Sequence, residues 1–402
     1  MASNRLNQLA SHLSGNQTSG SQIGIKNPED IVIVSAVRTP ICKAGRGKFK
    51  DTHHEYLLSL VLKSVCEKAG LDKALVEDII VGNVLPPSGG ASLARMAMLY
   101  AGFPESSSIA SAIRDGTIEI GIGAGVESMS SFGGASAAMK KEDYDQALLQ
   151  QQNVRDCLLP MGITSENVAS DFGITREQQD RFSAASHQKA ANAQKNGYFN
   201  NEIIPVPTKF TGPDGKTIDI VVTADDGVRP TTTLEGLSKL KPVFKKDGST
   251  TAGNASQVSD GAAAVLLMKR SRAIQLGLPI LGKYLTSSAV GVPPRIMGVG
   301  PAYAIPAALK KAGLSIADID IFEINEAFAS QAVYSIQKLG IDMSKVNPNG
   351  GAVAFGHPLG CTGARQISTL LYELRRTGKH VGLTSMCIGS GMGMCAIFEA
   401  EW

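Results

Sequence analysis

The sequence lacks three features that would assign it to a special class of protein. First, no sign of charge dominates: 39 Lys and Arg face 36 Asp and Glu, a net charge of +3 over 402 residues, too small to indicate nucleic acid or an anionic membrane as a partner. Second, no apolar run is long enough to cross a bilayer. Third, the cysteines are not paired in sequence. They stand at positions 42, 66, 157, 361, 387 and 395. Their scatter fits neither a disulfide framework nor a metal site, and it favours a reducing, intracellular compartment.

The first 29 residues are rich in Ser, Asn, Gln and Gly and have little core-forming pattern. Within them, Arg5-Leu6 is followed after five residues by His12-Leu13. This spacing resembles the N-terminal type of peroxisomal targeting signal, which an import receptor reads and which is no part of the fold. We therefore predict a targeting leader at residues 1–29, a peroxisomal location and an import receptor as a partner.

The rest of the chain has 43 glycines and alternating apolar strands and amphipathic helices, which is typical of a layered α/β fold. We expect strands over residues 31–34, 76–84, 117–123, 265–268, 280–290, 319–322 and 379–384. We expect helices over residues 55–69, 93–100, 109–114, 180–196, 303–312, 326–339 and 364–376, and a further small-residue helix opening the unit at 251–261.

The order of elements suggests an internal repeat with an insertion. We assign residues 30–125 with 245–272 to a first half, 273–402 to a second half, and 126–244 to a loop-rich lobe over the site. Helix, glycine, strand and glycine-rich turn recur in both halves. Before these elements the second half has a strand-like Val346, a glycine loop and a full helix. The first half has only Pro104 to Ser108 and a short helix, so the first repeat is cut short.

Two glycine-rich stretches carry groups suited to chemistry. His357 lies in Gly356-His-Pro-Leu-Gly-Cys-Thr-Gly363, just before a helix, where backbone amides favour developing negative charge. Cys387 ends a predicted strand and opens a glycine turn. A loop histidine or a buried cysteine alone has an ordinary structural explanation. Together, each among glycines, they predict a site for thiol-based acid/base or acyl chemistry.

These stretches, with Asn325-Glu-Ala-Phe328, Thr251-Ala-Gly-Asn-Ala-Ser256 and Met161-Gly-Ile-Thr164, resemble those of thiolases. With the leader they indicate the peroxisomal branch of the family, of plant type. The resemblance implies two similar α/β/α/β/α halves with a loop domain over the site. It also implies acyl transfer in fatty-acid β-oxidation, from 3-ketoacyl-CoA and CoA to a shortened acyl-CoA and acetyl-CoA. CoA is then a substrate, no cofactor is bound permanently, and the chain is expected to be a homodimer.

The resemblance also assigns roles to residues. His357 would activate a nucleophilic cysteine, and Cys387 would exchange a proton with the departing acetyl-CoA carbon and with incoming CoA. Asn325 would hold a water for one oxyanion hole, Gly389 would offer a backbone amide to the other, and Ser256 would touch the pantetheine arm of CoA. No metal is expected.

One family feature is missing. The family's nucleophilic cysteine lies in an Asn-Arg-Gln-Cys-Ser-Ser-Gly-Leu-Gln stretch, after a strand and at the start of a helix. Here Phe103-Pro-Glu105 runs through three serines into Ile109, so that strand, the nucleophile and the helix start are absent. We therefore expect impaired acyl transfer, because losing the nucleophile of a concerted site removes most of the rate.

Other interpretations remain open at this stage. A catalytically inactive chain that binds CoA or pairs with an intact subunit fits the same residues. A condensing enzyme of the ketoacyl-synthase type would need paired histidines. Gly121 to Gly125 resembles a dinucleotide loop only weakly. Structural roles are expected for Arg38 and Arg95, and a helix-start role for Glu326. The lysines at 239, 241, 245 and 246 suit either CoA phosphates or solvent.

Overall fold

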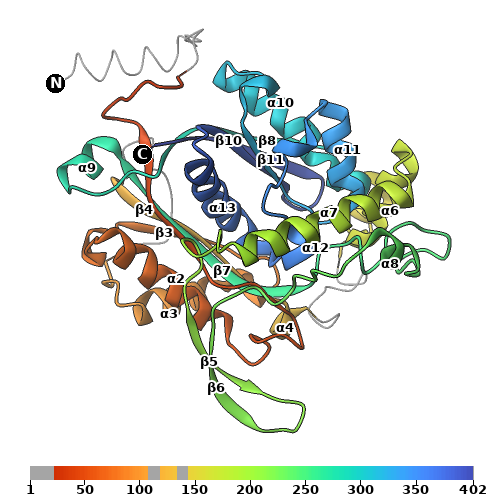
Figure 1. The fold of residues 1–402 in the computed structure, drawn as a ribbon, viewed down its shortest axis with the longest axis horizontal. Coiled ribbons are helices and arrows are strands. Elements are labelled where there is room, and N and C mark those ends of the chain that lie inside the picture. The colour runs from red at the N-terminus through yellow and green to blue at the C-terminus, as the bar shows by residue number, and fades with distance from the viewer. Residues whose placement is uncertain (1–21, 107–117, 134–143, 402) are drawn as a thin grey trace.

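The computed structural model describes residues 22–106, 118–133 and 144–401 (Figure 1). The predicted targeting signal and the predicted helix over 109–114 lie outside the described residues. Within them, no helix is long and apolar enough to cross a membrane.

A nine-stranded mixed sheet forms the frame of the molecule. Its strands follow the order β3-β4-β7-β1-β8-β11-β10-β9, and the short β2 pairs with β7. The strands are β1 (Ile31–Arg38), β2 (Cys42–Lys43), β3 (Asp78–Gly82), β4 (Ile120–Ser128), β7 (Ser259–Lys269), β8 (Gly282–Gly291), β9 (Ile321–Ile324), β10 (Val381–Cys387) and β11 (Met392–Ala400).

The two halves of this sheet have the same pairing pattern. In the first, β3 runs parallel to β4, β4 antiparallel to β7, and β7 antiparallel to β1. In the second, β9 runs parallel to β10, β10 antiparallel to β11, and β11 antiparallel to β8. The halves meet where β1 pairs with β8, at Val32↔Lys283 and Ile33↔Gly282. The predicted repeat is therefore present in the topology.

The two halves differ at their outer edges. In the second half, Val346 adds a parallel bridge to Phe322 of β9, and the Asn347 N–H donates to the Phe322 carbonyl. In the first half, the strand order ends at β3 within the described residues. This asymmetry is what a first repeat without its third strand would produce.

Helices cover the sheet, and one helix packs against both halves. They are α2 (His54–Ala69), α3 (Ala91–Tyr100), α9 (Arg270–Gln275), α10 (Gly300–Ala312), α11 (Ala329–Leu339), α12 (Ala352–Phe355) and α13 (Thr362–Thr377). Leu370, Leu371 and Leu374 of α13 share one buried cluster with Ile33 of the first half and Phe398 of the second, and Figure 1 shows α13 near the centre of the molecule. The loop that precedes α13 is thereby fixed between the two halves.

The inserted lobe consists of short helices, one long helix and a hairpin. Its elements are α4 (Met129–Phe132), α5 (Gln152–Asp156), α6 (Met161–Phe172), α7 (Arg176–Lys195), α8 (Leu234–Ser238), β5 (Val206–Thr211) and β6 (Thr217–Val222). The β5–β6 hairpin extends away from the sheet (Figure 1). Helix α7 begins with a capping box made by Thr175 and Gln178, which explains why this polar segment is helical.

Two local predictions were wrong. Gly123 and Gly125, predicted to open a turn, lie inside β4 opposite Val265 and Ala263 of β7. Their backbone takes the ordinary extended pairing, which also excludes the dinucleotide-loop alternative. The segment 251–258 forms turns with no helix before β7, since the side chain of Asn254 accepts the Thr251 N–H and thereby competes with helical bonding.

Candidate active site

Three of the predicted site residues gather at one edge of the second half-sheet. Asn325 directly follows β9 and Cys387 ends β10, and these strands are parallel neighbours with Ser385 opposite Ile324. The carboxyl ends of parallel strands meet at the same edge. The side-chain Nδ2 of Asn325 lies 3.3 Å from Nε2 of His357, so the glycine loop brings the imidazole to this edge as well.

The hydrogen bonds of His357 indicate one tautomer. Nδ1 of the ring lies 2.6 Å from the Thr362 hydroxyl, and that hydroxyl donates to the Pro358 carbonyl at 3.1 Å. Because the hydroxyl proton is used there, its oxygen accepts the proton on Nδ1. Nε2 then keeps its lone pair and accepts from the Asn325 amide. A neutral imidazole with an available Nε2 is suited to act as a base.

The surroundings of His357 keep it neutral. The ring is buried, and burial together with the positive charge of Arg365 lowers its pKa from 6.5 to about 4. Nη1 of Arg365 is bonded to the Glu323 carboxylate at 2.9 Å, and the guanidinium lies over the Phe355 ring. The buried ion pair therefore fixes the cation near the histidine loop.

Cys387 lies in a small apolar environment made by Met297, Ala327 and Phe328. Burial raises the pKa of its thiol to about 11, so the group holds its proton at neutral pH. The turn after it has Gly389 at φ +94° and Ser390 at φ +45°. Gly389 meets the left-handed conformation that this turn requires without a Cβ penalty.

Two further expectations concern the neighbourhood of this pocket. The Ser256 N–H donates to the Ala327 carbonyl at 2.9 Å, so Ser256 adjoins the Cys387 pocket. The side-chain oxygen of Asn325 is buried without a hydrogen-bond partner among the described residues. An acceptor of this kind fits the predicted task of holding a water.

The remaining singled-out residues are structural. Arg38 is fully buried and paired with Glu202 and Asp225 at 2.6 and 2.7 Å. Glu326 does not open a helix as predicted: α11 begins at Ala329, and the Glu326 carboxylate is buried and accepts from Ser186, Asn347 and Val353. Its position is set by these three donors. Lys239 pairs with Glu235 on the surface.

None of the other buried cysteines is suited to replace the missing nucleophile. Burial raises the pKa of Cys66 and Cys361 to about 12, and it also raises the pKa of Cys42 and Cys395. A thiol that holds its proton at neutral pH is a weak nucleophile. Cys157 is exposed and lies on the surface just after α5.

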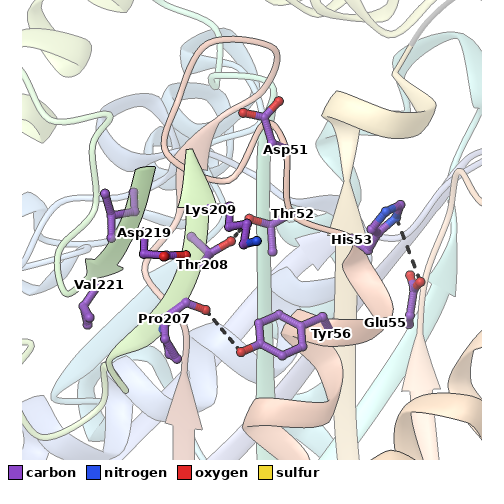
Figure 2. Close-up of a pocket in the computed structure, with 11 residues that line it drawn as sticks. Asp51, Thr52, His53, Glu55, Tyr56, Pro207, Thr208, Lys209, Asp219 and Val221 are labelled. Atoms are coloured by element: carbon purple, nitrogen blue, oxygen red, sulfur yellow. Dashed lines mark hydrogen bonds and ion pairs between the residues drawn. The ribbon is translucent and has the colours of Figure 1, made fainter. Parts of the chain in front are cut away.

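A cavity of about 740 Å³ lies away from these residues, between the N-terminal end of α2 and the β5–β6 hairpin (Figure 2). The Tyr56 hydroxyl donates to the Pro207 carbonyl, and the hydroxyls of Thr52 and Thr208 are 2.7 Å apart. These contacts anchor the base of the hairpin. The cavity contains none of the predicted site residues, so size alone does not locate the site.

Comparison with known proteins defines the class first. Residues 31–271 match the family model "Thiolase, N-terminal domain" and residues 278–400 match "Thiolase, C-terminal domain". The chain belongs to the thiolase family of acyltransferases.

Within the family, the chain is similar to peroxisomal 3-ketoacyl-CoA thiolases. It is 53% identical to that of Homo sapiens (98% of this chain, 99% of the relative) and 56% identical to 3-ketoacyl-CoA thiolase 2 of Arabidopsis thaliana (92% and 84%). The crystal structure of the dimeric peroxisomal thiolase of Saccharomyces cerevisiae matches with a TM-score of 0.85 at 48% identity, over 94% of this chain and 98% of that one. Human mitochondrial 3-ketoacyl-CoA thiolase in complex with CoA matches with a TM-score of 0.81 at 35% identity, over 93% and 98%.

The alignments also bear on the predicted missing segment. The alignment with the human relative runs over 422 positions, 20 more than the 402 residues of this chain. The relative therefore contains at least 20 residues that have no counterpart here. An absent strand with the start of the following helix needs a gap of about this size.

The sequence did not single out Thr362, Arg365 or Glu323, which orient and tune His357. Thr362 and Arg365 stand in the loop and helix that follow the histidine, at five and eight residues from it. Their role was hidden because the loop folds back on itself. Glu323 comes from a different strand, and no local pattern relates it to Arg365.

Proposed function

We propose that this chain is a 3-ketoacyl-CoA thiolase-type acyltransferase of peroxisomal fatty-acid β-oxidation that retains the proton-transfer half of the site and lacks the nucleophilic cysteine. The observation that carries the proposal is the neutral His357 imidazole. Its Nε2 is bonded to Asn325 at the same sheet edge as the buried thiol of Cys387. The reaction needs a base, an acid and oxyanion donors at one place.

In the full reaction, a cysteine thiolate adds to the keto carbon of 3-ketoacyl-CoA, and the bond between C2 and C3 breaks. The electron pair goes to acetyl-CoA as an enolate, which needs a proton. A thiol whose pKa is near 11 holds its proton until such a strong base appears, so Cys387 is suited to be the donor. CoA then replaces the acyl group on the nucleophile, and the thiolate left on Cys387 takes the proton of the incoming CoA.

Oxyanion stabilisation falls to two groups of donors in this proposal. Asn325 would hold a water next to His357, and the amide of Gly389 would face the second developing charge. Each such donor is worth about 100-fold or more in rate. Ser256, which adjoins the Cys387 pocket through Ala327, would contact the pantetheine arm of CoA.

The relatives support the wider setting of the proposal. CoA is the substrate in common, as the CoA complex of the human mitochondrial enzyme indicates for that protein. The peroxisomal relatives support a peroxisomal location through the Arg5-Leu6, His12-Leu13 signal, read by the import receptor. The dimeric yeast enzyme supports a homodimer. We keep residues 126–244 as the loop domain over the site, with 30–125 and 245–272 as one half and 273–402 as the other.

The test restores what is missing. A version of the chain with the family's Asn-Arg-Gln-Cys-Ser-Ser-Gly-Leu-Gln segment and its preceding strand inserted after Glu105 should cleave a medium-chain 3-ketoacyl-CoA in the presence of CoA. Replacing Cys387 by Ala in that version should lower kcat by at least about 100-fold. A folded, dimeric restored chain without thiolysis would refute the proposal and favour an inactive CoA-binding or partner subunit.

A further inference from the structure

One carboxylate of the first half holds the histidine loop of the second half. Glu127, next to the end of β4, is fully buried. Its Oε2 accepts the Gly360 N–H at 3.0 Å and the Val84 N–H at 3.0 Å, and its Oε1 accepts the Leu85 N–H at 3.1 Å. The side chain therefore bridges the segment after β3 to the turn Leu359–Cys361, which belongs to the His357 loop.

The backbone of this turn lies directly on the two strands of the first half. A Cβ added to Gly125 of β4 would lie 1.9 Å from the Gly360 carbonyl oxygen, and one added to Gly82 of β3 would lie 2.8 Å from it. Such an approach is open only to glycine. The loop is thus in contact with β3 and β4 at Gly360 and is held there by the Glu127 carboxylate.

The contact at Gly360 is connected to the imidazole through very few bonds. Gly360 stands three residues after His357 and two before Thr362. The Cys361 N–H donates to the Pro358 carbonyl at 2.9 Å. The Thr362 hydroxyl bonds both the Pro358 carbonyl and the imidazole Nδ1. A shift of Gly360 would therefore displace the group that fixes the tautomer of His357.

We propose that Glu127 is a positioning residue for His357: by holding Gly360 on the first half, it keeps the imidazole buried and directs Nε2 toward Asn325 and the Cys387 pocket. The inference rests on the role assigned to His357 in the proposed function. Glu127 acts through the loop backbone and touches no reacting atom. It makes the geometry of a base in the second half depend on a carboxylate in the first.

Loop release and loss of charge would change the pKa of His357 in opposite directions. Without the tie at Gly360, water reaches the ring, and the pKa rises from about 4 toward its ordinary value of 6.5, since burial is the main cause of the shift. Removing a negative charge near the ring would instead lower that pKa, in the same direction as the cation of Arg365 does. The sign of the change therefore distinguishes positioning from simple electrostatics.

The experiment is a pH titration of His357 by NMR in histidine-labelled full-length protein, with the signal assigned from a His357→Gln variant. Glu127→Ala should raise the His357 pKa by about one unit or more. Glu127→Gln should raise it less, because the amide oxygen can still accept from Gly360 and Val84. If Glu127→Ala does not fold, the isosteric Glu127→Gln carries the test with the same expected sign.

Glu166 offers a matched control. It is also buried and its carboxylate accepts backbone N–H groups, from Ser249 and Thr250 in the lobe. Glu166→Ala should leave the His357 pKa unchanged. An unchanged or lowered pKa in both Glu127 variants, or an equal rise in Glu166→Ala, would overturn the inference. The titration needs no turnover, so its result stays separate from the test of thiolysis.

Discussion

At the scale of single residues, His357 depends on Thr362 for its tautomer. The Thr362 hydroxyl, which donates to Pro358, accepts the proton on Nδ1. Thr362→Val removes that acceptor and leaves a buried N–H unsatisfied, which costs about 1–3 kcal/mol. We predict that the imidazole then shifts toward the Nε2–H tautomer, which cannot act as a base at Nε2.

Nitrogen chemical shifts of the labelled imidazole report this tautomer directly. Thr362→Ser, which keeps the hydroxyl, should retain the shifts of the parent chain. If Thr362→Val also retains them, the hydroxyl does not set the tautomer and the assignment of Nε2 as the base loses its support.

The sequence was sufficient to find His357, Cys387 and Asn325, because each stands beside glycines or at a strand end that alternation makes visible. It was not sufficient to find Glu127. Its partners are the backbone N–H groups of Val84, Leu85 and Gly360, and a backbone amide has no signature in the sequence. The same holds for the buried pair of Arg365 and Glu323, which is formed only when the helix and the strand pack together.

At the scale of elements, β4 carries glycines with different functions. A Cβ at Gly125 would collide with the Gly360 backbone, whereas a Cβ at Gly123 would meet only Leu267 Cδ1 at 3.8 Å. Gly125→Ala should therefore destabilise the protein by about 3 kcal/mol or more, because backbone must move to make room. Gly123→Ala should change stability by less than about 1 kcal/mol.

Urea unfolding of the two variants checks this contrast within a single strand. Equal losses of stability would mean that the close approach of β4 and the histidine turn is not a constraint on the fold.

These glycines also explain why the sequence predicted a turn where a strand runs. Glycine in a strand and glycine in a turn look alike until the element that approaches the strand is known. That element, the turn at Gly360, lies more than 200 residues further along the chain. The order of the halves could be predicted because it depends on the alternation of strands and helices, which is a local property.

At the scale of the whole molecule, burial of neutral histidines links stability to pH. The folded pKa of His357 is about 4, against 6.5 unfolded. The unfolded chain therefore binds more protons between these values, and the contribution of His357 to stability is full above pH 6.5 and falls as pH drops toward 4. Buried acids act in the opposite direction, since burial raises the pKa of Glu323 to about 7.

The pH effect of His357 is therefore best read as a difference between two chains. We predict that the free energy of unfolding of the parent, relative to His357→Gln, falls by about 2 kcal/mol from pH 6.5 to pH 5. His53→Gln, at an exposed ring, should show no such trend. A difference that stays constant over this pH range would contradict the buried, neutral imidazole.

The whole chain combines a complete second half with a first half whose sheet ends at β3 within the described residues, while relatives have at least 20 more residues. The thiolase relationship predicts the reaction, and the missing segment predicts that this chain performs it poorly. Both statements concern the same molecule and can be tested together.

The most direct measurement is CoA-dependent thiolysis of a medium-chain 3-ketoacyl-CoA by the purified chain beside the version with the restored segment. The account predicts turnover by the restored chain and at least about 1000-fold less by the chain as it stands, because the nucleophile cannot be replaced by a buried thiol of high pKa. Comparable turnover by the two chains, abolished in both by Cys387→Ala, would contradict it and would mean that another thiol performs the nucleophilic step.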